Sequence, residues 1–216
     1  TTAGFSIVSY TGTGSNATIG HGLGVAPSVI IVKPRNSSSE GFAMYHKSIA
    51  SDAETDFIRL DETNAAADNA NYWNDTAPTS TVFSIGTDSA TNGTTNNIAY
   101  CFAEVKGYSK FGSYTGNGGN QFIYTGFKPA FVIEKRSSNT SEWDVYDNKR
   151  NTFNSVTKVL KPNATDVEAT YTGLNFLSNG FEALGSLNDS GQTLIYLAFA
   201  ESPFVTAGTK AAGTAR

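Results

Sequence analysis

The sequence predicts an all-β protein, an antiparallel β-sandwich built from two duplicated halves of about 100 residues each. Two observations lead to this prediction: the composition of the chain and a long internal repeat. The chain has 14 Phe and 10 Tyr but only one Met, and 12% of its residues are aromatic. Aromatic and β-branched residues favour strands over helices, so the composition indicates a β protein large enough to bury a core.

The repeat covers nearly the whole chain. The strings GFSIVSYTGTG, GVAPSVIIVK and IAYCFAEV return as KFGSYTGNG, GFKPAFVIEK and LIYLAFAES. In these strings residues 10–12 match 114–116, residues 27–33 match 129–135, and residues 102–104 match 199–201. A repeat of this length is a whole supersecondary unit, so each candidate site can be tested by asking whether it occurs once or twice.

Short apolar runs bounded by Gly, Asn, Ser and Thr predict the individual strands. In the first half they cover residues 4–10, 27–33, 55–61, 81–86 and 96–105. In the second half they cover residues 113–116, 121–126, 129–135, 142–147, 157–162, 180–185 and 193–201. The continuously apolar runs VIIV and IAYCFA are typical of central strands. Helix signals are weak, since Asn and Asp interrupt the Ala-rich residues 64–73.

The two halves are joined by only a few residues, KGYSK, without a Pro- or Ser-rich linker. We therefore expect one sandwich over residues 4–206, whose halves 4–107 and 108–206 share a core about an approximate twofold axis. Two small separate domains are the alternative. Residues 207–216 are small and polar and predict a flexible tail. Because the chain starts at Thr1 rather than Met, we expect it to be part of a longer protein.

Charge and hydropathy exclude several classes of partner. Only 16% of the residues are charged and the net charge is −4, so no basic stripe is available to bind nucleic acid. No apolar segment approaches the length of a membrane span, and no signal peptide is present, so we expect no membrane insertion. The one cysteine, Cys101, lies in the apolar run IAYCFA and is expected to be a small buried side chain rather than a reactive thiol.

Glu104 and Glu201 are the residues that most suggest catalysis, because glycoside hydrolysis uses two carboxyl groups. Their repetition favours a framework role, since symmetry-equivalent positions start with similar pKa values and a hydrolase needs different ones. Each glutamate is then expected to end a strand and to pair with a Lys or Arg such as Lys33, Arg35, Lys135 or Arg136. We predict no catalytic residue and no enzyme activity, with a glycoside hydrolase as the alternative.

His21 and the run at residues 88–93 are candidate polar sites. His21 lies in the turn IGHGLG, where it is expected to be exposed, but no Ser nucleophile elbow accompanies it and His46 has no metal-ligand spacing with it. The run DSATNG resembles a calcium loop but lacks the closing Glu, so it predicts a polar hairpin turn. No metal and no cofactor are expected.

The two tryptophans differ in their surroundings. Trp143 matches Phe42 of the first half and is therefore expected in the core. Trp73 lies in the polar stretch NANYWNDTAP, and an aromatic ring beside Asn and Asp is typical of a glycan-binding loop. A loop plug is the alternative role for Trp73. The predicted ligand-binding residues are His21, Tyr72, Trp73 and Asn74.

Taken as a set, the strings SYTGTGSNATIGHGLGVAPSVIIVK, YWNDTAPTSTVFSIG, AYCFAEVKGYSKFGSYTGNG, YTGFKPAFVIEKR and LAFAESPF resemble a family of structural proteins of marine and cyanobacterial phages. These are tail-fibre and other virion proteins with concanavalin A-like lectin domains. The resemblance covers residues 4–204 and implies a jelly-roll or concanavalin A-like sandwich. It supplies no catalytic residues.

The resemblance implies a non-enzymatic module on the virion surface, synthesised in the host cytoplasm and forming the C-terminal part of a tail fibre or another appendage. Its expected partners are other virion proteins, further copies of itself in a trimer, and a host surface glycan. The alternatives are capsid decoration or fibre assembly without a ligand, and a glycan depolymerase.

Overall fold

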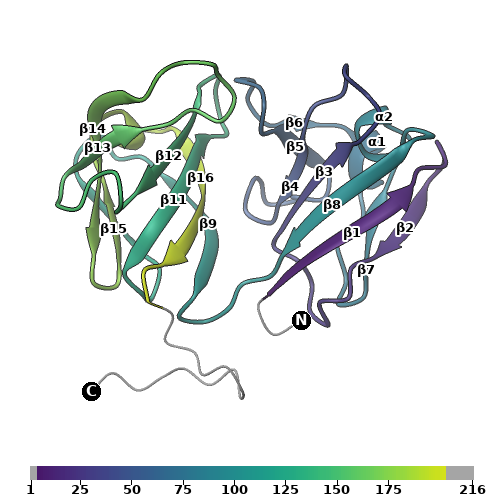
Figure 1. Ribbon diagram of the computed structural model, residues 1–216, viewed down its shortest axis with the longest axis horizontal. Coiled ribbons are helices and arrows are strands. Elements are labelled where there is room, and N and C mark those ends of the chain that lie inside the picture. The colour runs from purple at the N-terminus through teal and green to yellow at the C-terminus, as the bar shows by residue number, and fades with distance from the viewer. Residues whose placement is uncertain (1–3, 203–216) are drawn as a thin grey trace. The chain divides into compact units, whose positions relative to one another are not determined.

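The computed structural model describes residues 4–202, so the expected tail at residues 207–216 lies outside the described residues. The chain divides into two compact units, Thr1–Glu104 and Val105–Arg216 (Figure 1). It has 45% of its residues in strands and 6% in helices, and the paired strands are antiparallel. The predicted all-β sandwich of two halves is confirmed.

The first unit has one large and one small sheet. The large sheet has the order β1-β8-β3-β4-β5-β6, formed by β1 (Phe5–Thr11), β8 (Asn96–Phe102), β3 (Val29–Pro34), β4 (Ala43–His46), β5 (Asp56–Arg59) and β6 (Ala67–Asp68). The small sheet pairs β2 (Ala17–Gly20) with β7 (Val82–Ile85). Two single-turn helices, α1 (Ala70–Trp73) and α2 (Ser89–Asn92), complete the unit.

The second unit has two four-stranded sheets. One has the order β9-β16-β11-β12, formed by β9 (Ser109–Thr115), β16 (Thr193–Ala200), β11 (Pro129–Arg136) and β12 (Trp143–Asp147). The other has the order β10-β15-β14-β13, formed by β10 (Gln121–Tyr124), β15 (Gly180–Ala183), β14 (Ala169–Leu177) and β13 (Val156–Val159). A 3₁₀ turn, η1, covers Gly185–Asn188. Side chains from both sheets form the core of the second unit, among them Val132, Tyr196, Leu174 and Phe181.

Strand order shows the duplication directly. The order β1-β8-β3-β4 of the first unit returns as β9-β16-β11-β12 in the second, and the pair β2-β7 returns as β10-β15. The units differ where the first has α1 and the second has the long strand β14. The predicted central strands are confirmed, since β3 and β8 each have a neighbour on both sides.

The described strand pairs all join strands of one unit. The unit boundary falls between Glu104 and Val105, three residues before the expected one. This pairing is what the alternative of two small domains requires. The core shared between the halves stays a prediction.

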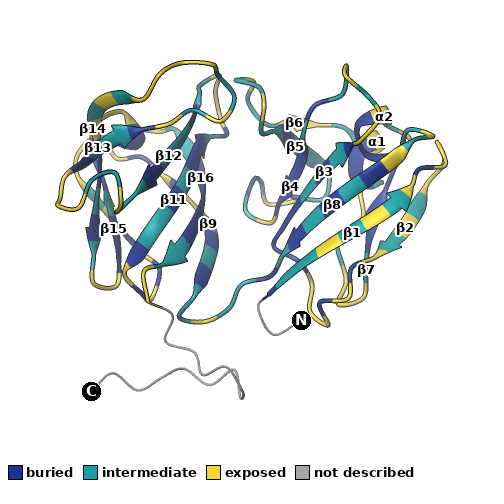
Figure 2. Cartoon of the chain, viewed as in Figure 1, coloured by how far each residue is buried: buried dark blue, intermediate teal, exposed yellow. Residues whose placement is uncertain are grey.

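Burial agrees with two of the sequence predictions (Figure 2), and the helix α2 corrects a third. Cys101 and Trp143 are both fully buried, as predicted. The run at residues 88–93 is not a hairpin turn, because it forms α2. Asp88 caps this helix by accepting a hydrogen bond from the backbone N–H of Ala90 at 2.8 Å, and a capping side chain favours the helical turn.

A buried asparagine just before the last strand of each half holds the YTG turn. In the first unit the backbone N–H of Thr13 donates to Asn92 Oδ1 at 2.8 Å, and Asn92 Nδ2 donates to the carbonyls of Ser15 and Gly86. The second unit repeats the arrangement with Asn188, which is 0% exposed. Asn117 N donates to Asn188 Oδ1 at 3.0 Å, and Asn188 Nδ2 donates to Asn117 Oδ1 and to the Gly119 carbonyl. We call Asn92 and Asn188 the asparagine latches.

Replacing a latch should destabilise its own unit. Asn188→Ala removes both the donor and the acceptor of the YTG turn and should lower the free energy of unfolding by about 2 kcal/mol. In a Trp73→Phe background, Trp143 is the only tryptophan, so its fluorescence during urea unfolding reports the second unit.

Asn92→Ala in the same background is the matched control. If the units unfold separately, this variant leaves the Trp143 transition unchanged, and if they share a core it shifts that transition as well. A change below about 0.5 kcal/mol for Asn188→Ala, the range of ordinary surface substitutions, would show that the latch does not hold the turn.

Candidate functional site

His21 is buried, contrary to the expectation that it would be exposed in its turn. Its side chain is 1% exposed. Nε2 lies 3.1 Å from the Thr79 carbonyl oxygen, and Nδ1 accepts a hydrogen bond from the backbone N–H of Leu23 at 3.2 Å. A neutral imidazole with its proton on Nε2 satisfies both contacts. His21 therefore fixes the turn from inside.

Tyr72 and Trp73 also lie in the interior, at 3% and 2% exposure. They belong to α1, and the Trp73 ring packs edge-on against Tyr45 with 6.0 Å between the ring centroids. Neither ring has an open face on which a sugar could stack, so the described position of Trp73 is that of the loop plug. Asn74 ends α1 in the left-handed conformation and accepts a hydrogen bond from Asn16 Nδ2 at 2.5 Å.

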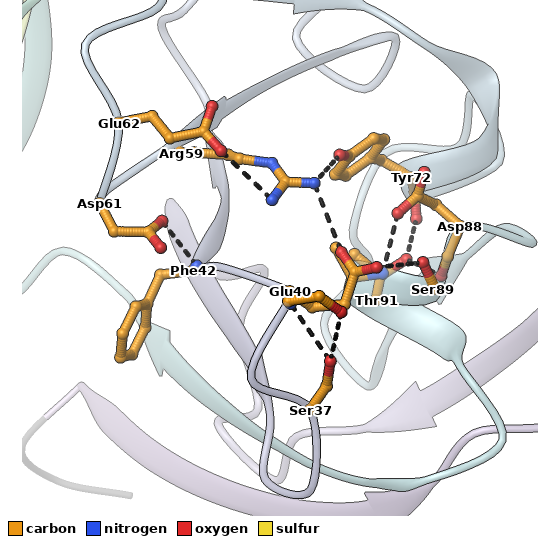
Figure 3. Close-up of polar contacts among 12 residues, drawn as sticks. Ser37, Glu40, Phe42, Arg59, Asp61, Glu62, Tyr72, Asp88, Ser89 and Thr91 are labelled. Atoms are coloured by element: carbon orange, nitrogen blue, oxygen red, sulfur yellow. Dashed lines mark hydrogen bonds and ion pairs between the residues drawn. The ribbon is translucent and has the colours of Figure 1, made fainter.

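A polar network fixes the hydroxyl of Tyr72 (Figure 3). Arg59 Nη2 donates to this hydroxyl at 2.8 Å and lies 3.6 Å from a Glu40 carboxylate oxygen, while Nη1 lies 3.4 Å from Glu62. Ser89 donates to the other Glu40 oxygen at 2.6 Å. The network thus joins α1, β5 and α2. The Tyr72 hydroxyl group already has a hydrogen-bond partner within the protein.

Glu104 and Glu201 each form an ion pair with a lysine, although the two lysines come from different places in the repeat. Glu104 lies 2.9 Å from Lys47 Nζ, and Glu201 lies 2.7 Å from Lys128 Nζ. The hydrogen bond from Lys128 lowers the pKa of Glu201. Neither lysine is one of the four cations named in the prediction, but each glutamate does end its half in an ion pair with a lysine.

The units differ on the outer face of β10, the edge strand of its sheet. Phe122 and Tyr124 are 46% and 65% exposed there. Gly180 on the neighbouring strand leaves room for a ring, because a Cβ at this position would lie 2.9 Å from a carbon of Phe122. We call the rung Phe122–Glu182–Asn175 together with Tyr124 the β10 surface.

Polar groups border these exposed rings. Glu182 lies opposite Phe122, and its Oε2 accepts a hydrogen bond from Asn175 Nδ2 at 2.8 Å. In the first unit the positions of Phe122 and Tyr124 are taken by Thr18 and Gly20. The second unit alone therefore carries an aromatic surface with a carboxylate and an amide beside it.

The units also differ along one rung that crosses the β9-β16-β11-β12 sheet. In the second unit this rung consists of Gly112, Tyr196, Glu134 and Asp144. The same rung in the first unit consists of Val8, Ala99, Val32 and Ala43. We call the set in the second unit the acidic rung.

The side-chain sizes along the acidic rung are matched to one another. A Cβ on Gly112 would lie 2.8 Å from the hydroxyl oxygen of Tyr196, so only glycine leaves space for that ring. Val8 and Ala99 take these two places in the first unit, where the large side chain is on the other strand. The exchange of small and large residues keeps the layer filled.

The acidic rung borders a pocket of about 520 Å³ in the second unit. The pocket lies between the ends of β11 and β12 and residues of β14 and η1. Its lining residues are Glu134, Lys135, Arg136, Ser141, Glu142, Asp144, Lys161, Tyr171, Thr172, Gly185, Ser186, Leu187 and Leu194. Few of these are apolar, so the pocket suits a polar ligand.

Glu134 is a buried carboxyl group. It is 1% exposed, and burial, together with the nearby Asp144 charge, raises its pKa to about 8, although the contact with Tyr114 opposes the shift. The Tyr114 hydroxyl oxygen lies 2.6 Å from Glu134 Oε2 and 2.7 Å from the Leu187 carbonyl oxygen. One hydroxyl proton cannot serve both contacts, whereas a protonated Glu134 supplies the second proton.

The first unit indicates which way the Tyr114 proton points. Its equivalent, Tyr10, donates to the Thr91 carbonyl at 2.5 Å, with an apolar valine in place of Glu134. By this comparison Tyr114 donates to Leu187, and neutral Glu134 donates to Tyr114. Oε1 of Glu134 is buried and has no hydrogen-bond partner among the described residues.

Asp144 faces Glu134 across the strand pair. Burial raises its pKa, while a hydrogen bond from the Tyr171 hydroxyl at 2.5 Å to Oδ1 acts in the opposite direction. Tyr171 comes from β14, the strand that the first unit lacks. The pocket therefore depends on both differences between the units, the acidic rung and β14.

The cations of the pocket have partners of their own. Lys135 Nζ donates to the Arg136 carbonyl at 2.8 Å and to Ser141 Oγ at 3.1 Å, and burial lowers its pKa to about 8. Arg136 pairs with Asp189 at 2.6 Å, and Lys161 pairs with Asp166 at 3.3 Å. No ion pair within 4.0 Å joins them to Glu134 or Asp144 in the described part of the chain.

Glu134 and Asp144 were not among the predicted site residues, because both lie inside predicted strands. The repeat contained the signal for Glu134. Aligning Lys33 with Lys135 places Glu134 opposite Val32, and a carboxyl group in place of valine within an apolar strand is costly to bury. Asp144 likewise replaces Ala43.

Among residues 4–202, no group of three or more His, Cys, Asp or Glu side chains is placed to hold a metal ion. Within the same residues, no helix is long and apolar enough to cross a bilayer.

Comparison with known proteins identifies the family. A family model described as "Domain of unknown function (DUF7483)" matches residues 1–203, and the chain belongs to this family. No curated protein and no solved structure matches the chain.

The pKa of Glu134 has a measurable consequence for stability. In the unfolded chain this carboxyl ionises near its ordinary value of 4.5, whereas the folded protein keeps the proton until about pH 8. Between these values the unfolded state binds fewer protons, so this group makes the free energy of unfolding fall as the pH rises.

Glu134→Gln should therefore flatten the fall in the free energy of unfolding between pH 5 and pH 8. The measurement is a series of urea unfolding curves at pH 5, 6, 7 and 8 for wild type and variant. Parallel pH profiles for the two proteins would contradict the assignment of a neutral Glu134.

Proposed function

We propose that this chain is a non-enzymatic binding module of a phage virion appendage, and that its second unit binds a host surface glycan on the β10 surface. The observation that carries the glycan-binding function is the exposed pair Phe122 and Tyr124, which is present in one copy of the repeat and absent from the other. An aromatic pair that the framework does not require is best explained by a ligand.

The chemistry of the β10 surface fits a sugar. Two rings at alternate positions of one strand lie on the same face, about 7 Å apart along the strand, and offer apolar surface to the C–H groups of successive sugar rings. The Glu182 carboxylate and the Asn175 amide beside them can bind hydroxyl groups. Apolar rings bordered by a few fixed polar groups are the usual composition of a small-molecule site.

The placement on a virion rests on the resemblance of the repeat strings to phage structural proteins. A duplicated β framework that carries a binding surface on one copy is compatible with such an appendage. The sites used for sugar binding would then be strand residues rather than the loop residues His21, Tyr72, Trp73 and Asn74, because three of these four side chains are buried.

The framework ion pairs of Glu104 and Glu201 favour the non-enzymatic role over the depolymerase. Each carboxylate is held by a lysine at the end of its own half. The hydrogen bond from Lys128 lowers the pKa of Glu201, whereas a catalytic acid needs a raised pKa.

Substitution of the two rings tests the glycan-binding function. Phe122→Thr with Tyr124→Thr keeps residues that favour strands and removes the stacking surface, so binding should weaken at least about tenfold if each ring contributes about 1 kcal/mol. The measurement is a glycan array with polysaccharides of candidate bacterial hosts, followed by titration of the strongest ligand.

Ile7→Thr is the matched control, since Ile7 is an apolar strand residue of the first unit that is 56% exposed. This variant should bind like wild type. Wild-type protein that binds no glycan would favour assembly without a ligand, and shortening of the polysaccharide during incubation would favour the depolymerase.

A further inference from the structure

We propose that the pocket of the second unit binds the primary ammonium group of an amino sugar, between Asp144 and Glu134. The pocket shares no lining residue with the β10 surface, whose rings are exposed on the edge strand β10. The ammonium site is argued from the pocket alone, and only the assignment to a sugar rests on the function proposed above.

The first argument is an unused acceptor. Glu134 lines the pocket, is 1% exposed, and leaves Oε1 without a hydrogen-bond partner among the described residues. A buried polar atom without a partner costs about 1–3 kcal/mol. If Oε2 carries the proton and donates to Tyr114, then Oε1 is the carbonyl oxygen of a neutral acid and accepts a hydrogen bond from a donor in the pocket.

The second argument is the charge of Asp144. Its Oδ1 accepts from Tyr171, and no lysine or arginine of the described chain forms an ion pair with it within 4.0 Å. The cations that line the pocket form their close contacts with other groups, as described above, while the charges of Lys161 and Arg136 act on Asp144 from beyond ion-pair distance and lower its pKa. A positively charged ligand beside Asp144 would supply a direct ion pair.

A primary ammonium satisfies both groups at once. It has three N–H donors and one positive charge, so one N–H can reach Glu134 Oε1 and another can reach Asp144. A divalent metal ion fits less well, because the described residues place no group of three metal-binding side chains together and one of the two carboxyls is neutral at pH 7. A neutral hydroxyl could donate to only one of the two oxygens.

The first unit shows that the acidic rung is not required for folding. Val32 and Ala43 occupy the places of Glu134 and Asp144 on the same framework, and both are fully buried. The buried carboxyl group of Glu134 is therefore an addition that lowers stability in the second unit. A carboxyl group with a strongly raised pKa, such as that of Glu134, is often found at a functional site.

The test is a titration of the full chain at pH 6, once with D-glucosamine and once with D-glucose. Binding is measured from the changes in NMR chemical shifts. The two sugars differ in one position, at which glucosamine carries an ammonium and glucose a hydroxyl. We expect glucosamine to bind at least tenfold more tightly and to shift the resonances of pocket residues.

Two variants separate the roles of the two carboxyl groups. Asp144→Asn removes the counterion and should weaken glucosamine binding at least tenfold. Glu134→Gln keeps an acceptor oxygen in the shape of the neutral acid and should bind within about threefold of wild type. The double variant Glu134→Val, Asp144→Ala installs the residues of the first unit and should lose the preference for glucosamine.

Several outcomes would overturn the proposal. Equal affinity for glucose and glucosamine would show that the ammonium is not recognised. An Asp144→Asn variant that binds glucosamine as tightly as wild type would show that Asp144 is not the counterion of the ammonium. Tighter binding of an Nα-acetyl-lysine amide than of glucosamine would reject the sugar. Near-ultraviolet circular dichroism, which reports the packing around the adjacent Trp143, identifies any variant that does not fold.

The result can be told apart from failure of the proposed function. Loss of glycan binding in the Phe122 and Tyr124 variant with retained glucosamine binding would support both sites. Glucosamine binding without any glycan binding would keep the ammonium site and reject the β10 surface.

Discussion

The asparagine latches are the contacts on which the rest of each unit depends. Each latch joins the turn before the last strand to the YTG turn that follows the first strand, and so closes the adjacent pair of strands β1-β8 or β9-β16. The glycine of each YTG turn lies so close to the opposite backbone that a Cβ would overlap with a carbonyl oxygen, of Gly93 or of Asp189. An amide side chain is suited to this place because it donates and accepts within one fully buried group.

This shared framework allows the remaining positions to differ. The same strand order and register hold a rung of small apolar residues in one unit and a rung with two carboxyl groups in the other. The cost of burying Glu134 is partly offset by Tyr114, whose hydroxyl group contacts Glu134. Tyr114 is already part of the shared framework, because its hydroxyl also bonds the Leu187 carbonyl. The repeat thus separates what the fold needs, which occurs twice, from what a ligand would need, which occurs once.

Much of the fold could be predicted from the sequence, because most of its strands are apolar runs bounded by turn residues. The prediction missed β2, β4 and β6, which are short, and β14, in which Gly173 and Asn175 interrupt the apolar pattern. The site was predicted less well. Trp73 lies among polar neighbours in the sequence, yet α1 turns its ring into the core, and this depends on tertiary packing with Tyr45. Glu134 could have been found by aligning the two copies, but Tyr171, the partner of Asp144, is on β14, which has no counterpart in the first unit.

Tyr114 connects the framework with the pocket. Its hydroxyl keeps the contact to the 3₁₀ turn that Tyr10 makes to α2 in the first unit, and it also lies against Glu134. The same turn ends at Asn188, the latch of this unit, so the protonation of Glu134 acts on a hydroxyl bonded to the segment that holds the YTG turn. An ionised Glu134 would compete with the Leu187 carbonyl for the single Tyr114 proton. The neutral acid leaves that proton to the framework, which explains how a carboxyl group could be added to the core without loss of the contact that closes the unit.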